Sequence, residues 1–354
     1  MIETTHGNLL EDDAEALVNT VNCVGVMGKG IALQFKQAFP ENFRVYEQAC
    51  RQAEVHPGRM LVVPSGQLAG PKFIINFPTK RHWKGKSRLE DVRAGLVALV
   101  EDVRRLGITS IALPPLGCGN GGLNWQDVRP LIEAAFAPLP EVRVLLHSPQ
   151  GTPETNAMPV ATERPQMTRA RALFVKLIER YRDPGYALSL LEVQKLAYFL
   201  QVSGEPLRLN FVKHKFGPYA DNLNHVLLKI EGHFIRGYGD RTARAEITLL
   251  PGVSAEADAL LADDSDARDR LERVTQLIEG FETPYGMELL ATVHWVAAEQ
   301  PAAAADASLA IREVQAWSTS KRDRLQPDHI QLAWRRLNER QWLSTSMYSS
   351  RGGK

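Results

Sequence analysis

Two glycine-rich stretches of this 354-residue sequence have the composition of a phosphate-binding site. The first, NTVNCVGVMGKGIALQF, follows the apolar run Ala16–Val21 and enters a helical pattern at Ile31; the second, LPPLGCGNGGLNW, follows the apolar run Ile108–Leu113. Glycines let backbone N–H groups approach phosphate oxygens closely, and a helix N-terminus adds the positive end of its dipole. One such loop is more often a plain turn, but two at one sheet edge favour a site for a nucleotide diphosphate.

A basic and aromatic segment, FPTKRHWKGKSR, follows the apolar run Phe73–Phe77. It places five positive charges between Lys80 and Arg88 without an acid, and it includes His82 and Trp83. Basic side chains can follow phosphates while an aromatic ring stacks on a base, which is typical of single-stranded nucleic-acid binding, although a solvated loop has the same composition. We expect Lys80 on a loop directly after the strand, at the same edge as the glycines. A solvated surface lysine is the usual alternative.

Other chemistry has weaker support in the sequence. Neither glycine loop has the spacing of a Walker A motif or of the dinucleotide fingerprint. Cys23 and Cys118 lie in the two loops, but no histidine stands in a recognisable relation to either, so small buried thiols in turns are the expected case. No His/Cys/Asp spacing matches a metal site, and we expect neither a metal nor a cofactor.

Composition limits the class of protein. The 42 basic and 41 acidic residues nearly cancel, so any nucleic-acid surface must be local, and we expect no membrane partner. Three cysteines cannot form a closed disulfide framework, and no basic-then-apolar leader precedes the first strand, so a cytoplasmic location is expected. The length suits two domains.

The order of patterns predicts where those domains divide. Residues 1–150 alternate β-rich apolar runs with helical patterns, which predicts an α/β domain with a mostly parallel sheet between helices. Residues 151–166 carry prolines and small polar residues and read as a linker; residues 167–354 read as a mostly helical second domain. The remaining expected strands are Met60–Val63, Val142–Leu146 and, in the second half, Ala243–Leu250. The expected helices are Ile31–Cys50, Arg88–Leu106, Asn124–Ala137, Thr168–Tyr181, Ser189–Ser203, Ala220–Ile230, Asp266–Phe281, Gly286–Glu299 and Pro327–Leu343.

The stretch GNLLEDDAEALVNTVNCVGVMGKGIALQFKQAFP, together with LPPLGCGNGGLNW, resembles the macrodomain, the α/β fold that binds ADP-ribose. The resemblance covers roughly residues 1–147. The form MGKGIA and the lysine of FPTKRHWK are similar to the branch that contains the terminal ADP-ribose protein glycohydrolases and the bacterial DNA ADP-ribosyl glycohydrolases of the DarG type. The chain length and the helical second half favour the bacterial group.

The resemblance implies roles for residues of both loops. Asn8 and Leu9 would lie near the adenine, although many macrodomains carry an aspartate at the first position. Asn22 would face the distal ribose; an asparagine capping a turn is an equally good interpretation. The remaining ADP-ribose contacts would come from Gly28, Lys29, Gly30, Ile31, Pro115, Leu116, Gly117, Cys118, Gly119, Asn120 and Gly121.

Lys80 and Asn22 are the catalytic residues that the resemblance implies. In the related branch the matching lysine attacks the anomeric carbon and a loop aspartate assists; here Gly121 takes the place of that aspartate. Lys80 could instead form a transient imine with the opened sugar, or stabilise charge as the glycosidic bond breaks. The residues expected to contact DNA are Arg81, His82, Trp83 and Lys84.

The resemblance implies an antitoxin that removes ADP-ribose from thymidine bases of single-stranded DNA. Its partners would be ADP-ribosylated single-stranded DNA and the DarT toxin, which the second domain would bind and inhibit; part of that domain, LLEVQKLAYFLQVSGEPLRLNFVKHKFGPYADNLNHVL, loosely resembles Panacea-type antitoxin domains. An ADP-ribose reader without catalysis, or a hydrolase of ADP-ribosylated protein carboxylates, are the alternatives. A nucleophilic amine at position 80 would be of no use to a reader.

Overall fold

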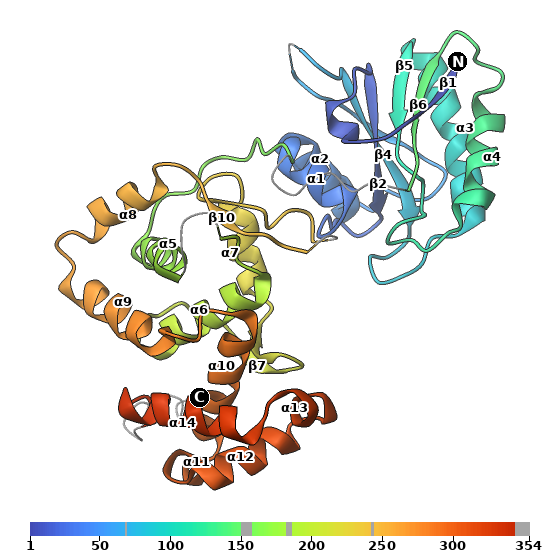
Figure 1. Cartoon of the computed structure of the whole chain (residues 1–354). Helices are drawn as coiled ribbons and strands as arrows, with labels where there is room; N and C mark the ends of the chain where they lie inside the picture. Colours follow the sequence, from blue (N-terminus) through green and yellow to red (C-terminus); the bar gives the residue numbers. More distant parts are fainter. Residues whose placement is uncertain (68, 150–157, 182–185, 242–243, 344–354) are drawn as a thin grey trace. The chain divides into compact units, whose positions relative to one another are not determined.

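A computed structural model of the chain describes residues 1–67, 69–149, 158–181, 186–241 and 244–343 (Figure 1). It divides into two compact units. The first comprises Met1–Glu163 and the short segment Gly239–Ala243, and the second comprises Arg164–Tyr238 and Arg244–Lys354. Part of the predicted linker, residues 151–157, lies outside the described residues. Residues 158–163 belong to the first unit, where the Ala161 N–H donates to the Gln37 carbonyl at 2.8 Å, and residues 164–166 belong to the second.

A six-stranded sheet forms the centre of the first unit. The strand order is β1-β6-β5-β2-β4-β3, and every neighbouring pair is parallel except β3 and β4, which are antiparallel. The predicted α/β fold with a mostly parallel sheet is therefore confirmed. The strands are β1 (Ile2–Thr5), β2 (Ala16–Asn22), β3 (Leu61–Pro64), β4 (Phe73–Lys80), β5 (Ser110–Leu113) and β6 (Arg143–His147).

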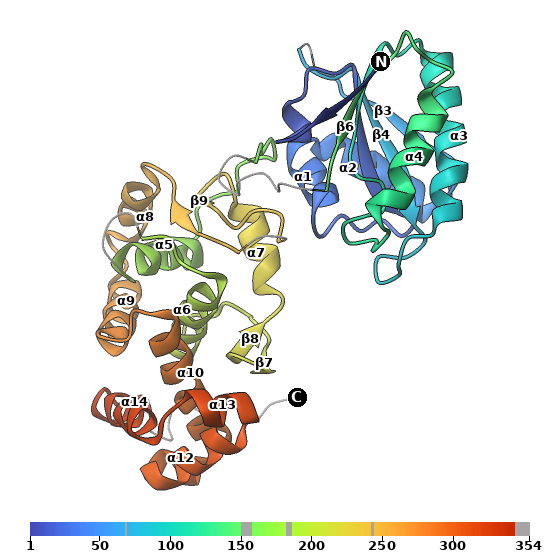
Figure 2. The ribbon, with the colours of Figure 1, turned by 45° about the vertical axis from the view of Figure 1, so that its right-hand side comes forward.

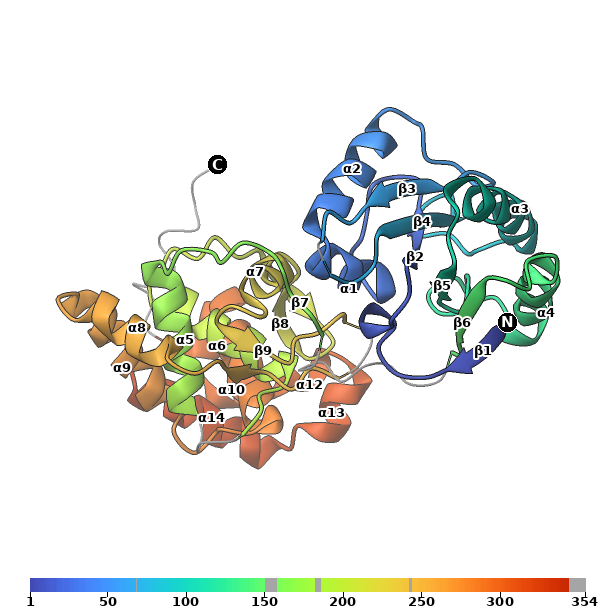
Figure 3. The same ribbon diagram turned by 90° about the horizontal axis from the view of Figure 1, so that it is seen from above.

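Helices cover both faces of this sheet, with α1 and α2 on one side and α3 and α4 on the other (Figures 2 and 3). Neighbouring strand residues point to opposite faces, and the core follows that rule. Ile74 of β4 packs in a cluster with Phe35, whereas Ile75 packs in another cluster with Val92. The helical elements are η1 (Leu9–Glu11), α1 (Ile31–Ala38), α2 (Pro40–Arg51), α3 (Leu89–Leu106) and α4 (Trp125–Phe136).

Two differences from the sequence expectation concern a proline and an edge strand of the sheet. The single helix expected at Ile31–Cys50 is two helices, because Pro40 lacks the N–H needed to continue α1 and instead occupies the first turn of α2. The edge strand β1 was not predicted; it pairs with β6 alone, and its four residues give little pattern.

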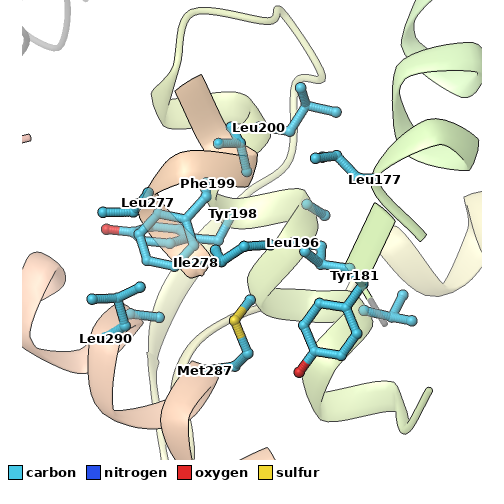
Figure 4. Close-up of a cluster of buried hydrophobic side chains, with 14 of the residues drawn as sticks. Leu177, Tyr181, Leu196, Tyr198, Phe199, Leu200, Leu277, Ile278, Met287 and Leu290 are labelled. Carbon is cyan, nitrogen blue, oxygen red and sulfur yellow. The ribbon is translucent and has the colours of Figure 1, made fainter. Parts of the chain in front are cut away.

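The second unit is mostly helical, as predicted. Figure 4 shows part of its core, in which Leu196 and Phe199 of α6 lie with Leu290 of α10. The helices are α5 (Arg169–Tyr181), α6 (Leu190–Val202), α7 (Leu223–Ile230), α8 (Val253–Leu261), α9 (Ser265–Ile278), α10 (Pro284–Glu299), α11 (Pro301–Ala305), α12 (Ala307–Ala316), α13 (Thr319–Arg324) and α14 (Pro327–Glu339). The strands are β7 (Phe211–His214), β8 (Gly217–Ala220), β9 (Ile235–Arg236) and β10 (Thr248–Leu249).

Two local predictions in this unit were wrong. The helix expected from Ala220 begins only at Leu223, because residues Gly217–Ala220 form β8 of a hairpin. Gly217 has φ +87°, and a Cβ there would lie 2.8 Å from the Thr292 hydroxyl of α10, so the position requires glycine for space and conformation. The predicted strand Ala243–Leu250 shortens to the two residues of β10 among the described residues.

Charged side chains lie inside the second unit. Lys321 donates to Glu288 at 2.7 Å and to the Thr292 hydroxyl at 2.9 Å, and the side chains of Lys321 and Glu288 are each 1% exposed. Lys195 donates to the Pro218 carbonyl at 2.6 Å, and burial lowers its pKa to about 7. Buried charges need such partners, because an unpaired charge in an apolar core is strongly destabilising.

Candidate active site

Three chain segments meet at one edge of the six-stranded sheet. The strands β2, β4 and β5 run parallel, so the segments that follow Asn22, Lys80 and Leu113 leave the sheet at the same, carboxyl edge. These segments are the first glycine loop (residues 23–30), the basic loop (residues 81–88) and the second glycine loop (residues 114–124). The edge therefore combines the two predicted phosphate-binding loops with the predicted catalytic lysine.

The side chain of Asn22 shapes the first glycine loop. Its Oδ1 accepts from the N–H groups of Val24 and Val26 at 3.0 and 3.3 Å, and its Nδ2 donates to the Val26 carbonyl. The Tyr46 hydroxyl donates to the backbone carbonyl of Asn22 at 2.8 Å and lies 3.1 Å from its Oδ1. Asn22 therefore holds its own loop, and its role toward a distal ribose stays a prediction.

The first loop ends at the N-terminus of α1. Gly30 is the N-cap, with φ +64° and no side-chain cap, which is a backbone arrangement suited to an anion. Its N–H donates to the Asp240 carbonyl at 3.0 Å, and Gln34 donates to the Asp240 carboxylate at 2.7 Å. Asp240 belongs to the segment Gly239–Ala243 of the first unit, and no signal in the sequence pointed to it because it lies so far along the chain.

The second glycine loop turns back on itself through its own backbone. The Leu123 N–H donates to the Gly117 carbonyl at 3.0 Å, and the Gly122 N–H donates to the Gly119 carbonyl at 3.1 Å. A Cβ at Gly121 would lie 2.2 Å from the Gly117 carbonyl oxygen, so no side chain fits there without a backbone shift. The assisting aspartate that the resemblance implies for the related branch would therefore not fit at position 121 without such a shift.

Lys80 bridges β4 and the second glycine loop. It is the last residue of β4 and pairs in register with Asn22, so its predicted position on a loop was wrong. The strand continues through Pro78 because β3 pairs with β4 only as far as Asn76, so the missing N–H interrupts no ladder on that side. The Lys80 ammonium donates to the Asn120 carbonyl, and burial lowers its pKa, which favours the neutral amine.

The basic loop, which follows Lys80 in the sequence, presents an exposed indole. Trp83 is 49% exposed; its ring stacks on His82 with centroids 5.6 Å apart, and the Lys84 ammonium lies 5.0 Å from the ring centroid. Arg81 is bound differently, because it donates to the buried Asp91 of α3 at 3.1 and 3.3 Å. Arg81 thus anchors the loop on α3, while His82, Trp83 and Lys84 face outward.

The remaining predicted ligand residues are Asn8 and Leu9, at η1, and residues in or next to the two glycine loops. Asn8 caps η1, since its Oδ1 accepts from the Leu10 N–H at 3.2 Å, and Leu9 is buried in the cluster that contains Phe35. Lys29, Gly119 and Asn120 are exposed, Gly28, Ile31, Pro115 and Cys118 are partly exposed, and Leu116 is buried.

Neither loop cysteine is activated. Burial raises the pKa of the Cys23 and Cys118 thiols to about 11, so neither is a thiolate near neutral pH. Within the described ranges there is no group of three or more His, Cys, Asp or Glu side chains that could hold a metal ion. No described helix is long and apolar enough to span a bilayer.

The fold and the loop arrangement define a macrodomain. The Macro domain family model matches residues 18–132, a range that contains both glycine loops and Lys80. Over the whole length, the chain is 46% identical to a DNA ADP-ribosyl glycohydrolase of Thermus aquaticus across 354 residues, covering 100% of this chain and 98% of that protein. A DNA ADP-ribosyl glycohydrolase of Mycobacterium tuberculosis is 44% identical over 360 residues, covering 95% and 99%.

The chain belongs to the DNA ADP-ribosyl glycohydrolase family and is a hydrolase, which confirms the resemblance drawn from its loops. A third relative has a different organisation. It is a DNA ADP-ribosyl transferase-DNA ADP-ribosyl glycohydrolase fusion protein of Thermosipho africanus, 35% identical over 146 residues, which cover 37% of this chain and 38% of that protein.

Proposed function

We propose that the chain binds ADP-ribose at this edge and hydrolyses it from thymidine bases of single-stranded DNA, thereby reversing modification by a DarT toxin. The observation that carries the proposal is the position of Lys80, whose amine is hydrogen-bonded to one glycine loop while its strand neighbour Asn22 supports the other. The exposed Trp83, with His82 and Lys84 against its ring, offers a stacking surface for DNA bases three residues after Lys80.

The residues present suit a simple hydrolysis. The bond between the anomeric carbon and the base nitrogen breaks, its electron pair leaves with the base, and water supplies the hydroxyl group to the carbon and the proton to the nitrogen. Lys80 serves either as a nucleophile or as a cation that stabilises developing negative charge. The lowered pKa of Lys80 allows a test that separates the two roles. If the neutral amine attacks, the rate of hydrolysis rises with pH toward that pKa. If the ammonium is needed, the rate falls over the same range.

We assign the second unit to toxin binding and keep residues 151–166 as the predicted connection between domains 1–150 and 167–354, while residues 158–163 and the segment Gly239–Ala243 group with the first unit. Support comes from the Thermosipho africanus relative, in which a transferase and a glycohydrolase are joined in one protein. The acidic run Glu256–Asp269 is partly used in ion pairs within the second unit. Several of its carboxylates are paired within the second unit: Glu256 with Arg164 at 2.6 Å, Asp258 with Lys176 at 2.9 Å and Asp264 with Arg169 at 2.9 Å.

The substrate proposal is tested by offering two modified substrates. The purified full chain is incubated with single-stranded DNA that carries labelled ADP-ribose on thymidine, and separately with ADP-ribosylated glutamyl protein. We expect loss of label from the DNA. Loss from the protein alone would instead indicate a hydrolase of protein carboxylates, and no loss from either would indicate an ADP-ribose reader.

The toxin proposal is tested with the full-length Lys80→Ala variant, which keeps the second unit but lacks the amine. This variant should still co-purify with DarT and slow DNA modification in a reaction that contains both proteins. If it neither binds the toxin nor slows modification, protection by this chain depends on hydrolysis alone.

A further inference from the structure

Ser87 ties the basic loop to the second glycine loop. It lies two residues before the start of α3, is 7% exposed, and its N–H donates to the Gly121 carbonyl at 3.0 Å. At the other end of the same loop, Lys80 donates to the carbonyl of Asn120. Both ends of the segment that carries Trp83 are therefore fastened to consecutive carbonyls of the second glycine loop.

The side chain of Ser87 fills the inside of that glycine loop. A Cβ at Gly121 would lie 2.3 Å from the Ser87 hydroxyl, and a Cβ at Gly117 would lie 3.0 Å from the Ser87 Cβ and 3.1 Å from its hydroxyl. Gly117 also has φ +72°. The two glycines thus leave room for a serine from another segment, and the loop curls around it.

The hydroxyl of Ser87 is buried and has no hydrogen-bond partner among the described residues. A buried hydroxyl that lacks a partner costs free energy, and natural proteins seldom retain one without a use. The hydroxyl lies against the backbone of the loop that is expected to hold the diphosphate. A small movement of residues 117–121 would change which backbone acceptors it can reach.

We propose that Ser87 is a positioning residue for ligand binding: its hydroxyl gains a hydrogen-bond acceptor when the second glycine loop closes on the diphosphate of ADP-ribose. The free state carries an unsatisfied hydroxyl and the bound state does not, so part of the free energy of binding comes from this residue. The inference rests on the proposed ADP-ribose site and adds to it a residue outside the two glycine loops.

The test is Ser87→Ala in the full chain, with free ADP-ribose as the ligand. Replacing an unsatisfied hydroxyl by a methyl group should leave the melting temperature unchanged or raise it, while ADP-ribose affinity falls roughly tenfold. If Ser87 only packed against its neighbours, its replacement would not lower ADP-ribose affinity while the melting temperature stayed unchanged or rose. On the DNA substrate, KM should rise by a similar factor while kcat stays within about twofold, because the Lys80 amine is retained.

Ser203→Ala is the matched control, since Ser203 is a buried serine of the second unit whose hydroxyl does have a partner, the Leu200 carbonyl at 2.7 Å. It should lower the melting temperature and leave ADP-ribose affinity unchanged. Unchanged affinity in Ser87→Ala, or a fall in melting temperature like that of the control, would overturn the proposal. Calorimetry with free ADP-ribose separates this result from a wrong choice of substrate, because binding by the unmodified chain is measured without DNA.

Discussion

The two units use lysine in opposite ways. In the first unit, Lys80 stands at the end of a strand, partly exposed, and its amine contacts a backbone carbonyl of a glycine loop. In the second unit, Lys321 is buried against Glu288 and holds α13 to α10. A charge at the rim of a sheet can be removed without opening the core, whereas a charge inside a helical bundle cannot. Function in the first unit should therefore be separable from stability, and in the second unit it should not.

The largest effect is expected for Lys80→Ala. Release of ADP-ribose from DNA should fall by roughly 10³-fold or more, while ADP-ribose affinity stays within a few-fold, because the amine acts mainly in the transition state. Single-turnover kinetics and calorimetry measure the two quantities. Lys72 directly precedes the other end of β4 and pairs at the surface with Glu15, so Lys72→Ala is the control that should keep activity. Near-normal turnover in Lys80→Ala would show that Lys80 takes no part in the mechanism.

Next in size is Glu288→Ala, which leaves Lys321 buried without its carboxylate. The second unit should lose about 3–5 kcal/mol of stability, measured as an earlier denaturant transition, while the first unit keeps its hydrolase activity. Glu272 is suited as a control because its pair with Arg180 at 3.2 Å is exposed, and Glu272→Ala should cost no more than about 1 kcal/mol. Loss of hydrolysis together with the loss of stability of the second unit would show that the units do not act separately.

A third test, Gly119→Glu, places a carboxylate in the second glycine loop. A Cβ at Gly119 meets no heavy atom within 4 Å, so the chain should fold normally. The added negative charge should weaken ADP-ribose binding by at least about tenfold through repulsion of the diphosphate. Gly119→Ala controls for the side chain without the charge and should bind nearly as well as the unmodified chain. Unchanged ADP-ribose affinity in a folded Gly119→Glu variant would show that the diphosphate does not bind at this loop.

The smallest effect concerns pH and Lys195. Its pKa is about 7 in the folded unit against 10.5 for an ordinary lysine, so between these values the unfolded chain binds a proton that the folded chain does not. Stability therefore rises with pH from about 7 toward 10, and below 7 the cost of burying the charged amine is fully present. The melting temperature of the second unit should rise more between pH 7 and pH 9 than that of Lys195→Met, by a few degrees. Lys229→Met, at an exposed position of α7, should keep the slope of the unmodified chain; equal slopes in all three proteins would contradict the assignment.

Five of the six strands of the first unit, and its loops, were predictable because their signals are local. Glycine spacing, apolar runs and the basic segment located the three segments that meet at the sheet edge. The break between α1 and α2 was missed, although its signal, Pro40, lies inside the predicted helix. The extension of β4 to Lys80 was not, because it depends on where β3 stops pairing.

Contacts between distant segments account for the rest. Nothing near Gly117 or Gly121 in the sequence indicates that Ser87 lies between them, and nothing near Gly30 indicates Asp240. In the second unit, the short alanine-rich helices α11 and α12 lack a strong apolar period, and the β7–β8 hairpin depends on the fit of Gly217 against Thr292. Such features follow from packing, which a single sequence does not display.

The position of β1 has a consequence for synthesis on the ribosome. Among the strands of this sheet β1 is translated first, yet it pairs with β6 alone, and Ile2 is in register with Val144. An emerging chain must therefore hold β1 unpaired until nearly the whole macrodomain has been translated, because the partner strand is the last of the sheet. Protease protection of Ile2–Thr5 should appear only in nascent chains in which His147 has cleared the exit tunnel, so the sheet is completed by the pairing of its first and last strands in chain order.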